Sequence, residues 1–144
     1  MGDGSLKDDC IKLANNLGVQ RCTHFVGRLS HKKAMIYLKK ADLFFSLNYH
    51  GSIGNGVLEA AKFGLPIVTL LHPGCLTEKL NFFQIFKKNK DLQNNVADFL
   101  NRFLDNPSLR ESMSNNSFKF SKYYLVSWEE RMDIEFSLIK NICS

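Results

Sequence analysis

The chain has 144 residues, 44% of them apolar and 12% aromatic, which is enough to bury one core and predicts a single domain over residues 1–144. Its 19 Lys and Arg exceed its 14 Asp and Glu, an excess that favours an anionic ligand but is also common on solvated surfaces. No window is apolar enough for a secretory signal or a membrane span, and the 4 cysteines lack the spacing of metal ligands, so we expect a cytoplasmic protein without a metal site.

The first part of the chain alternates between helix and strand patterns. Apolar residues at the spacing of a helix face run from Leu6 to Leu17, and Gly18 ends them as a C-terminal glycine does. The segment "CTHFVG" at 22–27 is short and rich in β-branched and aromatic residues, which predicts a strand. Ser30 then caps an expected helix over 31–41.

The middle of the chain continues this alternation. The apolar run "DLFFSL" at 42–47 predicts a strand, and a third helix is expected from Asn55 to Phe63. The near-continuous apolar segment "LPIVTLL" at 65–71 is typical of a strand buried on both faces. Helices and strands that alternate in this way predict parallel strands joined by crossover helices.

The last third of the chain has a helical pattern. We expect helices over 91–106 and about 109–122, the second opened by Pro107. A last helix starts at Ser127, whose "SWEE" forms a capping box. The sequence therefore predicts an α/β fold, a Rossmann-like parallel open sheet with crossover helices and a helical C-terminal cluster over about 107–144.

The stretch "GSIGNGVLEAAKFGLP" at 51–66 is the strongest candidate for a ligand site. Such a turn lies at the carboxyl ends of parallel strands, where the positive end of the following helix dipole attracts anions. Gly54 and Gly56 would let a phosphate reach the main chain, and Glu59, expected in the first helical turn, could accept ribose hydroxyls. Glycines in such a turn also serve simply to pack a helix tightly on a sheet, so the pattern alone leaves both interpretations open.

The chain resembles the nucleotide-sugar-binding half of the retaining GT-B glycosyltransferases of family 4, the glycosyl transferases group 1. The resemblance runs from Gly2 to about Glu130 and rests on these motifs in order: "GDGSLKDDC", "VQRCTHFVGRLSHKKAMIYLKKADLFFSL", "GNGVLEAAKFGLPIV", "GCLTE", "FLDNPSLRESM" and "SWEE". It implies the C-terminal half of a GT-B fold. It also implies a nucleoside diphosphate sugar as donor substrate, with no cofactor.

The resemblance assigns Glu59 to the second of two family glutamates separated by seven residues, the one that binds the donor's ribose hydroxyls. The first falls at Gly51, so either His50 or Ser52 substitutes, or the donor is held differently, or activity is lost. The donor-binding residues that the resemblance implies are Gly27, Arg28, Leu29, Gly51, Ser52, Gly54, Asn55, Gly56, Val57, Glu59, Gly74 and Glu78.

The implied roles differ between these positions. The amides of residues 54–57 would approach the diphosphate, while residues 27–29 would border the nucleobase. There Arg28 either stacks on the base or is an ordinary surface arginine. Gly74 would approach the sugar, with Cys75 in place of the family's second glycine. No catalytic residue is identified.

Two parts of the full-length relatives fall outside the similarity: an upstream basic pair that neutralises the diphosphate, and an N-terminal Rossmann domain that binds the acceptor. Arg28 and Lys33 resemble the basic pair locally, but the order of the motifs assigns them elsewhere. We therefore expect an acceptor-binding subunit as a partner. The face of the last helix that carries Trp128, Met132 and Phe136 either meets such a partner or folds back on its own domain.

The leading hypothesis is a glycosyltransferase, or the donor-binding part of one, that transfers a sugar from a nucleoside diphosphate sugar and is retaining and hexosyltransferase-like if active. The alternative is a non-catalytic nucleotide-sugar-binding or regulatory module that has lost the reaction. Lysines scattered over several helices disfavour a nucleic-acid-binding protein. We expect the protein in the cytoplasm, either free or held at a membrane face through a partner.

Overall fold

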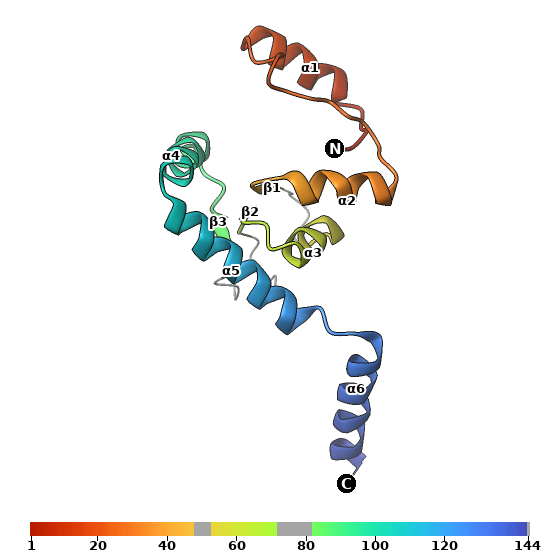
Figure 1. Cartoon of the computed structure of the whole chain (residues 1–144). Helices are drawn as coiled ribbons and strands as arrows, with labels where there is room; N and C mark the ends of the chain where they lie inside the picture. The colour runs from red at the N-terminus through yellow and green to blue at the C-terminus, as the bar shows by residue number, and fades with distance from the viewer. Residues whose placement is uncertain (48–52, 72–81, 144) are drawn as a thin grey trace. The chain divides into compact units, whose positions relative to one another are not determined.

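The computed structural model describes residues 1–47, 53–71 and 82–143. The chain forms two compact units, Met1–Lys40 and Ala41–Ser144 (Figure 1). This division is one of geometry, and the single domain over 1–144 stays a prediction. The sequence positions Gly51, Ser52, Gly74 and Glu78 lie outside the described residues.

The first unit contains the helices α1 (Lys7–Asn16) and α2 (His31–Lys40), both as the periodicity predicts. Just beyond α1, Gly18 has a φ of +70°, and the amides of Gly18 and Val19 donate to the carbonyls of Asn15 and Ala14. This is the pair of bonds that closes a helix through a left-handed glycine. At the start of α2 the carbonyl of Ser30 accepts from the Ala34 amide at 2.9 Å.

The strand expected at 22–27 is absent, and that prediction is wrong. Residue 22 belongs to a turn and residues 23–27 have no regular secondary structure, and the Thr23 hydroxyl donates to the Val19 carbonyl at 3.0 Å. A strand exists only where a neighbour pairs its backbone groups. Among the described residues, the only sheet is built from three other segments. The β-branched segment at 22–27 therefore has no neighbouring strand with which to form hydrogen bonds.

The second unit is built on a parallel sheet in the order β1 (Phe44–Ser46), β2 (Ile67–Leu70), β3 (Gln84–Phe86). Phe44 pairs with Ile67, and Val68 pairs with Gln84. All four residues of β2 are buried, as its unbroken apolar sequence predicts for a central parallel strand. The α/β prediction with a parallel open sheet is confirmed, while β3 is a strand that the sequence pattern did not reveal.

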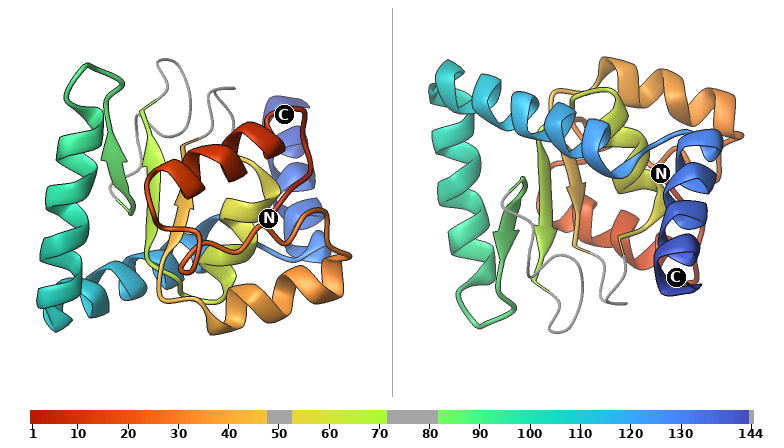
Figure 2. Two further views of the ribbon diagram at one scale, coloured as in Figure 1. Left: turned by 90° about the horizontal axis from the view of Figure 1, so that it is seen from above. Right: turned by 90° about the horizontal axis from the view of Figure 1, so that it is seen from below.

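The helices of this unit are α3 (Asn55–Lys62), α4 (Leu92–Asp105), α5 (Pro107–Tyr124) and α6 (Trp128–Cys143). α4 lies beside β3, at one edge of the sheet (Figure 2). Strand residues and helix residues share one core cluster, whose buried members are Val68, Leu70, Phe86, Phe99, Phe103 and Met113. α4 and α5 pack on the sheet through this cluster, and α3 in turn contacts α5, β1 and β2.

The ends of the helices follow the expected signals. Asn106 caps α5 by accepting from the Leu109 amide at 3.0 Å, with Pro107 as the first helical residue. The capping box of α6 is confirmed: the Ser127 amide donates to the Glu130 carboxylate at 2.7 Å, and the Glu130 amide donates to the Ser127 hydroxyl at 3.1 Å. The starts of α5 and α6 are therefore both set by local hydrogen bonds.

Much of the apolar surface of α6 faces solvent. Trp128 is 71% exposed and Phe136 is 55% exposed, while Met132 is half-buried. The face of α6 that carries these residues, which was expected either to meet a partner or to fold back on its own domain, is thus largely exposed. Within the described residues, none of the helices combines the length and apolar character that crossing a membrane requires.

Candidate functional site

The beginning of α3 is the first part of the candidate site. The connection that leaves the carboxyl end of β1 leads into Gly54, which precedes the helix with φ −70° and ψ 158°. The amides of Asn55 and Gly56 lie in the first turn, where a helix offers no carbonyl to receive them. The amide of Val57 donates to the Gly54 carbonyl at 2.9 Å, and the Val57 side chain is buried. Of the four amides expected to approach a diphosphate, that of Val57 is therefore already used.

The two glycines of this turn have different surroundings. A Cβ placed on Gly54 would meet nothing within 4 Å, and its backbone angles suit any residue. A Cβ placed on Gly56 would lie 3.2 Å from the ring of Phe44, so this glycine lets α3 pack closely on β1. The packing interpretation thus accounts for Gly56, and it leaves Gly54 without a structural reason to be glycine among the described residues.

Glu59 lies in the second turn of α3, which corrects its expected place in the first turn. The difference matters because a carboxylate beyond the first turn gains little from the helix dipole. Val57, Ala60 and Ala61 bury one side of α3, and Glu59 is half-buried on the other side. The Glu59 side chain thus lies on the side of α3 that does not pack in the core.

Glu59 faces a groove of about 770 Å³, here called the Glu59 groove, between α3, the end of α5 and the start of α6. Lys62 and Leu58 line it from α3, Tyr124 from α5 and Arg131 from α6. A volume of this size is within the range of small-molecule sites.

The walls of the Glu59 groove are held in place by contacts of their own. The Tyr124 ring stacks on that of Phe120 with centroids 4.8 Å apart, and Arg131 pairs with Glu135 at 3.0 Å. Glu130, which also lines the groove, is fixed by its bond to the Ser127 amide. The groove therefore offers carboxylates, a guanidinium group and an aromatic ring from side chains that are already positioned.

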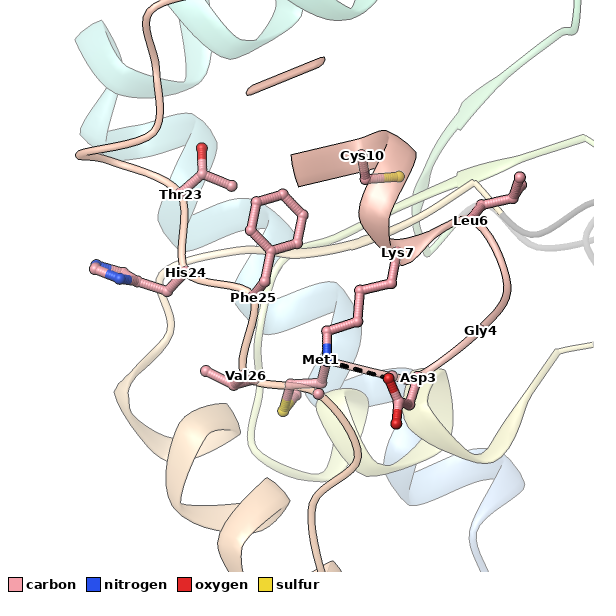
Figure 3. Close-up of a pocket in the computed structure, with 12 residues that line it drawn as sticks. Met1, Asp3, Gly4, Leu6, Lys7, Cys10, Thr23, His24, Phe25 and Val26 are labelled. Atoms are coloured by element: carbon pink, nitrogen blue, oxygen red, sulfur yellow. Dashed lines mark ion pairs between the residues drawn. The ribbon is translucent and has the colours of Figure 1, made fainter. Parts of the chain in front are cut away.

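Residues 27–29 belong to the first unit. Gly27 has a φ of +65°, a backbone conformation that favours glycine. Its carbonyl accepts from the Gly2 amide at 2.8 Å. Arg28 is exposed and Leu29 is half-buried. Gly27 also borders a pocket of about 530 Å³, in which Lys7 and Asp3 form an ion pair at 3.2 Å beside Phe25 and Cys10 (Figure 3).

The structure groups the sequence-predicted residues into two sets. Residues 54–57 and Glu59 lie together on α3, and residues 27–29 lie together in a loop of the first unit. Gly51, Ser52, Gly74 and Glu78, like His50 and Cys75, lie outside the described residues. In the part of the chain that the structure describes, no cluster of His, Cys, Asp and Glu has the composition of a metal site.

Sequence reasoning missed Tyr124 and Arg131 as neighbours of Glu59. They are separated from it by more than sixty positions and carry no motif. The capping box at Ser127 was the one signal near them, because it fixes where α6 starts and hence where Arg131 lies. It does not by itself show that the α5–α6 connection returns to α3.

A helix that follows a glycine turn at the carboxyl end of a parallel strand, with a half-buried carboxylate facing a groove, gives this α/β protein a candidate ligand site. A profile of one family, the glycosyl transferases group 1, matches residues 1–120. The chain belongs to that family.

Two relatives support this assignment. The chain is 30% identical to the 2-deoxystreptamine N-acetyl-D-glucosaminyltransferase of Niallia circulans over 115 residues, which cover 78% of this chain and 29% of the relative. It is 37% identical to the glycogen synthase of Mycobacterium tuberculosis over 68 residues, which cover 47% of this chain and 16% of that enzyme. The chain thus matches less than a third of the length of either relative.

Proposed function

We propose that this chain is the donor-binding, C-terminal half of a retaining family 4 glycosyltransferase, which uses a nucleoside diphosphate sugar. The observation that carries the proposal is Glu59, a half-buried carboxylate that faces a groove and lies on the helix that follows the glycine turn in a group 1 chain. The relatives' names also support sugar transfer, since one is an N-acetyl-D-glucosaminyltransferase and another a glycogen synthase.

The diphosphate would lie at the start of α3, against the amides of Asn55 and Gly56. These donors belong to the positive end of the helix, so they favour the negative charge that grows on the diphosphate as the glycosidic bond breaks. Backbone dipoles stabilise this charge without reorganising, because they are fixed before the reaction. Gly54 keeps the approach to these amides open.

The ribose would lie further along α3, at Glu59. Glu59 is five positions beyond Gly54, and at about 1.5 Å per residue its backbone lies roughly 7–8 Å along the helix from the turn. That is a suitable separation for a diphosphate and the sugar attached to it. A carboxylate has acceptor sites for two hydroxyls at once, which suits a ribose diol.

The acceptor would come from elsewhere. We expect an acceptor-binding subunit or domain to close over the carboxyl ends of the strands and to exclude water from the reacting bond. The finer assignments, including the expected base contacts of Arg28 and Leu29 and the sugar contacts of Gly74 and Glu78, belong to the same proposal.

Calorimetric titration of the purified chain with uridine diphosphate and guanosine diphosphate tests the proposal. We expect saturable binding of one nucleotide, and at least a tenfold loss of affinity in Glu59→Gln, because the amide is a poorer hydroxyl acceptor than the carboxylate. Glu111→Gln, an exposed glutamate of α5, makes the same change of charge away from the groove and should bind as the unmodified chain does.

Absence of binding to either nucleotide would contradict the donor-binding proposal. Equal affinity in the unmodified chain and Glu59→Gln would remove the ribose role of Glu59. Binding without sugar transfer, even with an acceptor domain supplied, would instead support the non-catalytic module.

A further inference from the structure

The last two turns of α5 have one face buried and one face exposed. Ser117 and Phe120 are buried, whereas Phe118, Lys119 and Tyr123 are exposed, Tyr123 by 75%. The exposed residues, with Lys122, recur at steps of one, three and four positions, so they form one continuous side of the helix. At Phe118 this side meets Gly64, just after α3, and it continues over the exposed surface at Lys119, Lys122 and Tyr123.

Phe82, Lys119, Lys122 and Tyr123 surround a shallow hollow of about 420 Å³, and they are called here the lysine–aromatic face. The two rings at its edge rest on other rings. Phe82 lies 5.9 Å from Phe120, and Tyr123 lies 4.9 Å from Tyr124, between ring centroids. Phe120 is only 1% exposed and contacts Phe82 directly and Tyr123 through Tyr124, so these contacts reduce the side-chain entropy that remains to be lost on binding.

The charge of this face is positive and uncompensated. From residue 112 to residue 128 the sequence has two lysines and no acidic residue. Among the residues that the structure describes, neither Lys119 nor Lys122 has a carboxylate partner within ion-pair distance. The lysine–aromatic face thus combines two ammonium groups with the exposed ring of Tyr123 and the half-buried ring of Phe82.

We propose that the lysine–aromatic face binds the surface of a lipid bilayer that contains anionic phospholipids. Tyrosine rings are enriched at the boundary between headgroups and acyl chains, and lysines near that boundary are attracted by anionic headgroups. Peripheral binding of this kind needs no membrane-spanning segment. The face would let the protein work beside a membrane without a partner to hold it there.

A bilayer suits this face better than a nucleic acid does. The face has only two cations, Lys119 and Lys122, so it could neutralise only about two phosphates and would bind a nucleic acid with low affinity. The apolar share of the face, in contrast, gains free energy when it leaves water for the headgroup region. Single-stranded RNA is therefore the competing ligand that the experiment has to exclude.

Co-sedimentation of the full chain with vesicles tests the proposal. We expect binding to vesicles of phosphatidylcholine with phosphatidylglycerol, much less binding to phosphatidylcholine alone, and weakening by added salt. At about 1 kcal/mol per lysine, Lys119→Gln with Lys122→Gln should weaken the partition about thirtyfold. Tyr123→Ser should weaken it on anionic vesicles as well, through lost apolar contact.

The pair Lys87→Gln and Lys90→Gln is the matched control, since it removes the same charge from exposed lysines outside the hollow. It should bind the vesicles as the unmodified chain does. The proposal is overturned by absence of vesicle binding, by equal binding to neutral and anionic vesicles, or by equal losses in the two lysine pairs. Binding of a single-stranded oligonucleotide that prevents vesicle binding and depends on Lys119 and Lys122 would also overturn it, in favour of RNA.

Discussion

The hydroxyl of Ser117 donates a 2.6 Å hydrogen bond to the carbonyl of Leu65, and both residues are buried. Leu65 is the residue with which the chain leaves α3, and its amide donates to the Ala60 carbonyl. A single side chain of α5 thus holds the turn between α3 and β2. The position of α3, and with it that of Glu59, depends on this contact.

Replacing Ser117 with alanine should destabilise the second unit by about 1–3 kcal/mol, because the Leu65 carbonyl would remain buried without its donor. Urea denaturation followed by circular dichroism measures this loss. Ser112→Ala, an exposed change on the same helix, should alter stability by less than about 0.5 kcal/mol. Equal stability of the two variants would show that the hydrogen bond contributes nothing net.

Replacing Gly64 with alanine should have a larger effect. Gly64 has a φ of +68°, and its added Cβ would overlap the ring of Phe118. Backbone strain of about 1–2 kcal/mol then adds to overpacking of about 1–3 kcal/mol. When Phe118 is already alanine, Gly64→Ala should no longer cause overpacking, so its own contribution should fall to the backbone strain alone. Purely additive losses in this cycle would contradict the predicted overlap.

The two glycines of the α3 turn should respond differently to a β-branched side chain. Gly56→Val should lower the melting temperature, because its side chain meets Phe44, so loss of nucleotide binding in that variant would be ambiguous. Gly54→Thr has open space and keeps a good capping residue, so it should fold as the unmodified chain does while losing at least tenfold in nucleotide affinity. Unchanged affinity in folded Gly54→Thr would argue against a diphosphate at this turn.

Ser127→Ala should loosen the start of α6. It removes one of two reciprocal bonds of the capping box, at a typical loss of about 1 kcal/mol. Hydrogen exchange should therefore accelerate about fivefold at the first amides of α6 and remain unchanged in α4. An equal acceleration in both helices would instead indicate that Ser127 supports the whole unit.

Local rules were enough for most elements of the fold. Gly18, Gly64, Pro107 and Ser127 mark helix ends through interactions within a few residues, so the sequence alone predicts them. The strands depend on partners that are distant in sequence. The composition at 22–27 suggested a strand that has no neighbour to pair with, and β3, only three residues long, gave no pattern before its pairing with β2 was known.

The candidate site was predictable along α3 but not across the groove. Gly54 and Glu59 belong to one continuous stretch, and the resemblance to a family assigned them together. Gly56 could not be interpreted without Phe44, since only the structure shows the ring behind it. Tyr124 and Arg131 meet Glu59 through tertiary packing, which no local spacing encodes.

The complete burial of β2 has a consequence for how the molecule opens. Its backbone is paired with β1 on one side and β3 on the other, and each of its four side chains is inside. The amides of residues 67–70 should then exchange only when the whole second unit unfolds, while those of exposed α6 exchange through local fraying. A protease should therefore cleave α6 well before it cleaves the sheet. The chain that remains would still contain the strands on which α3 packs.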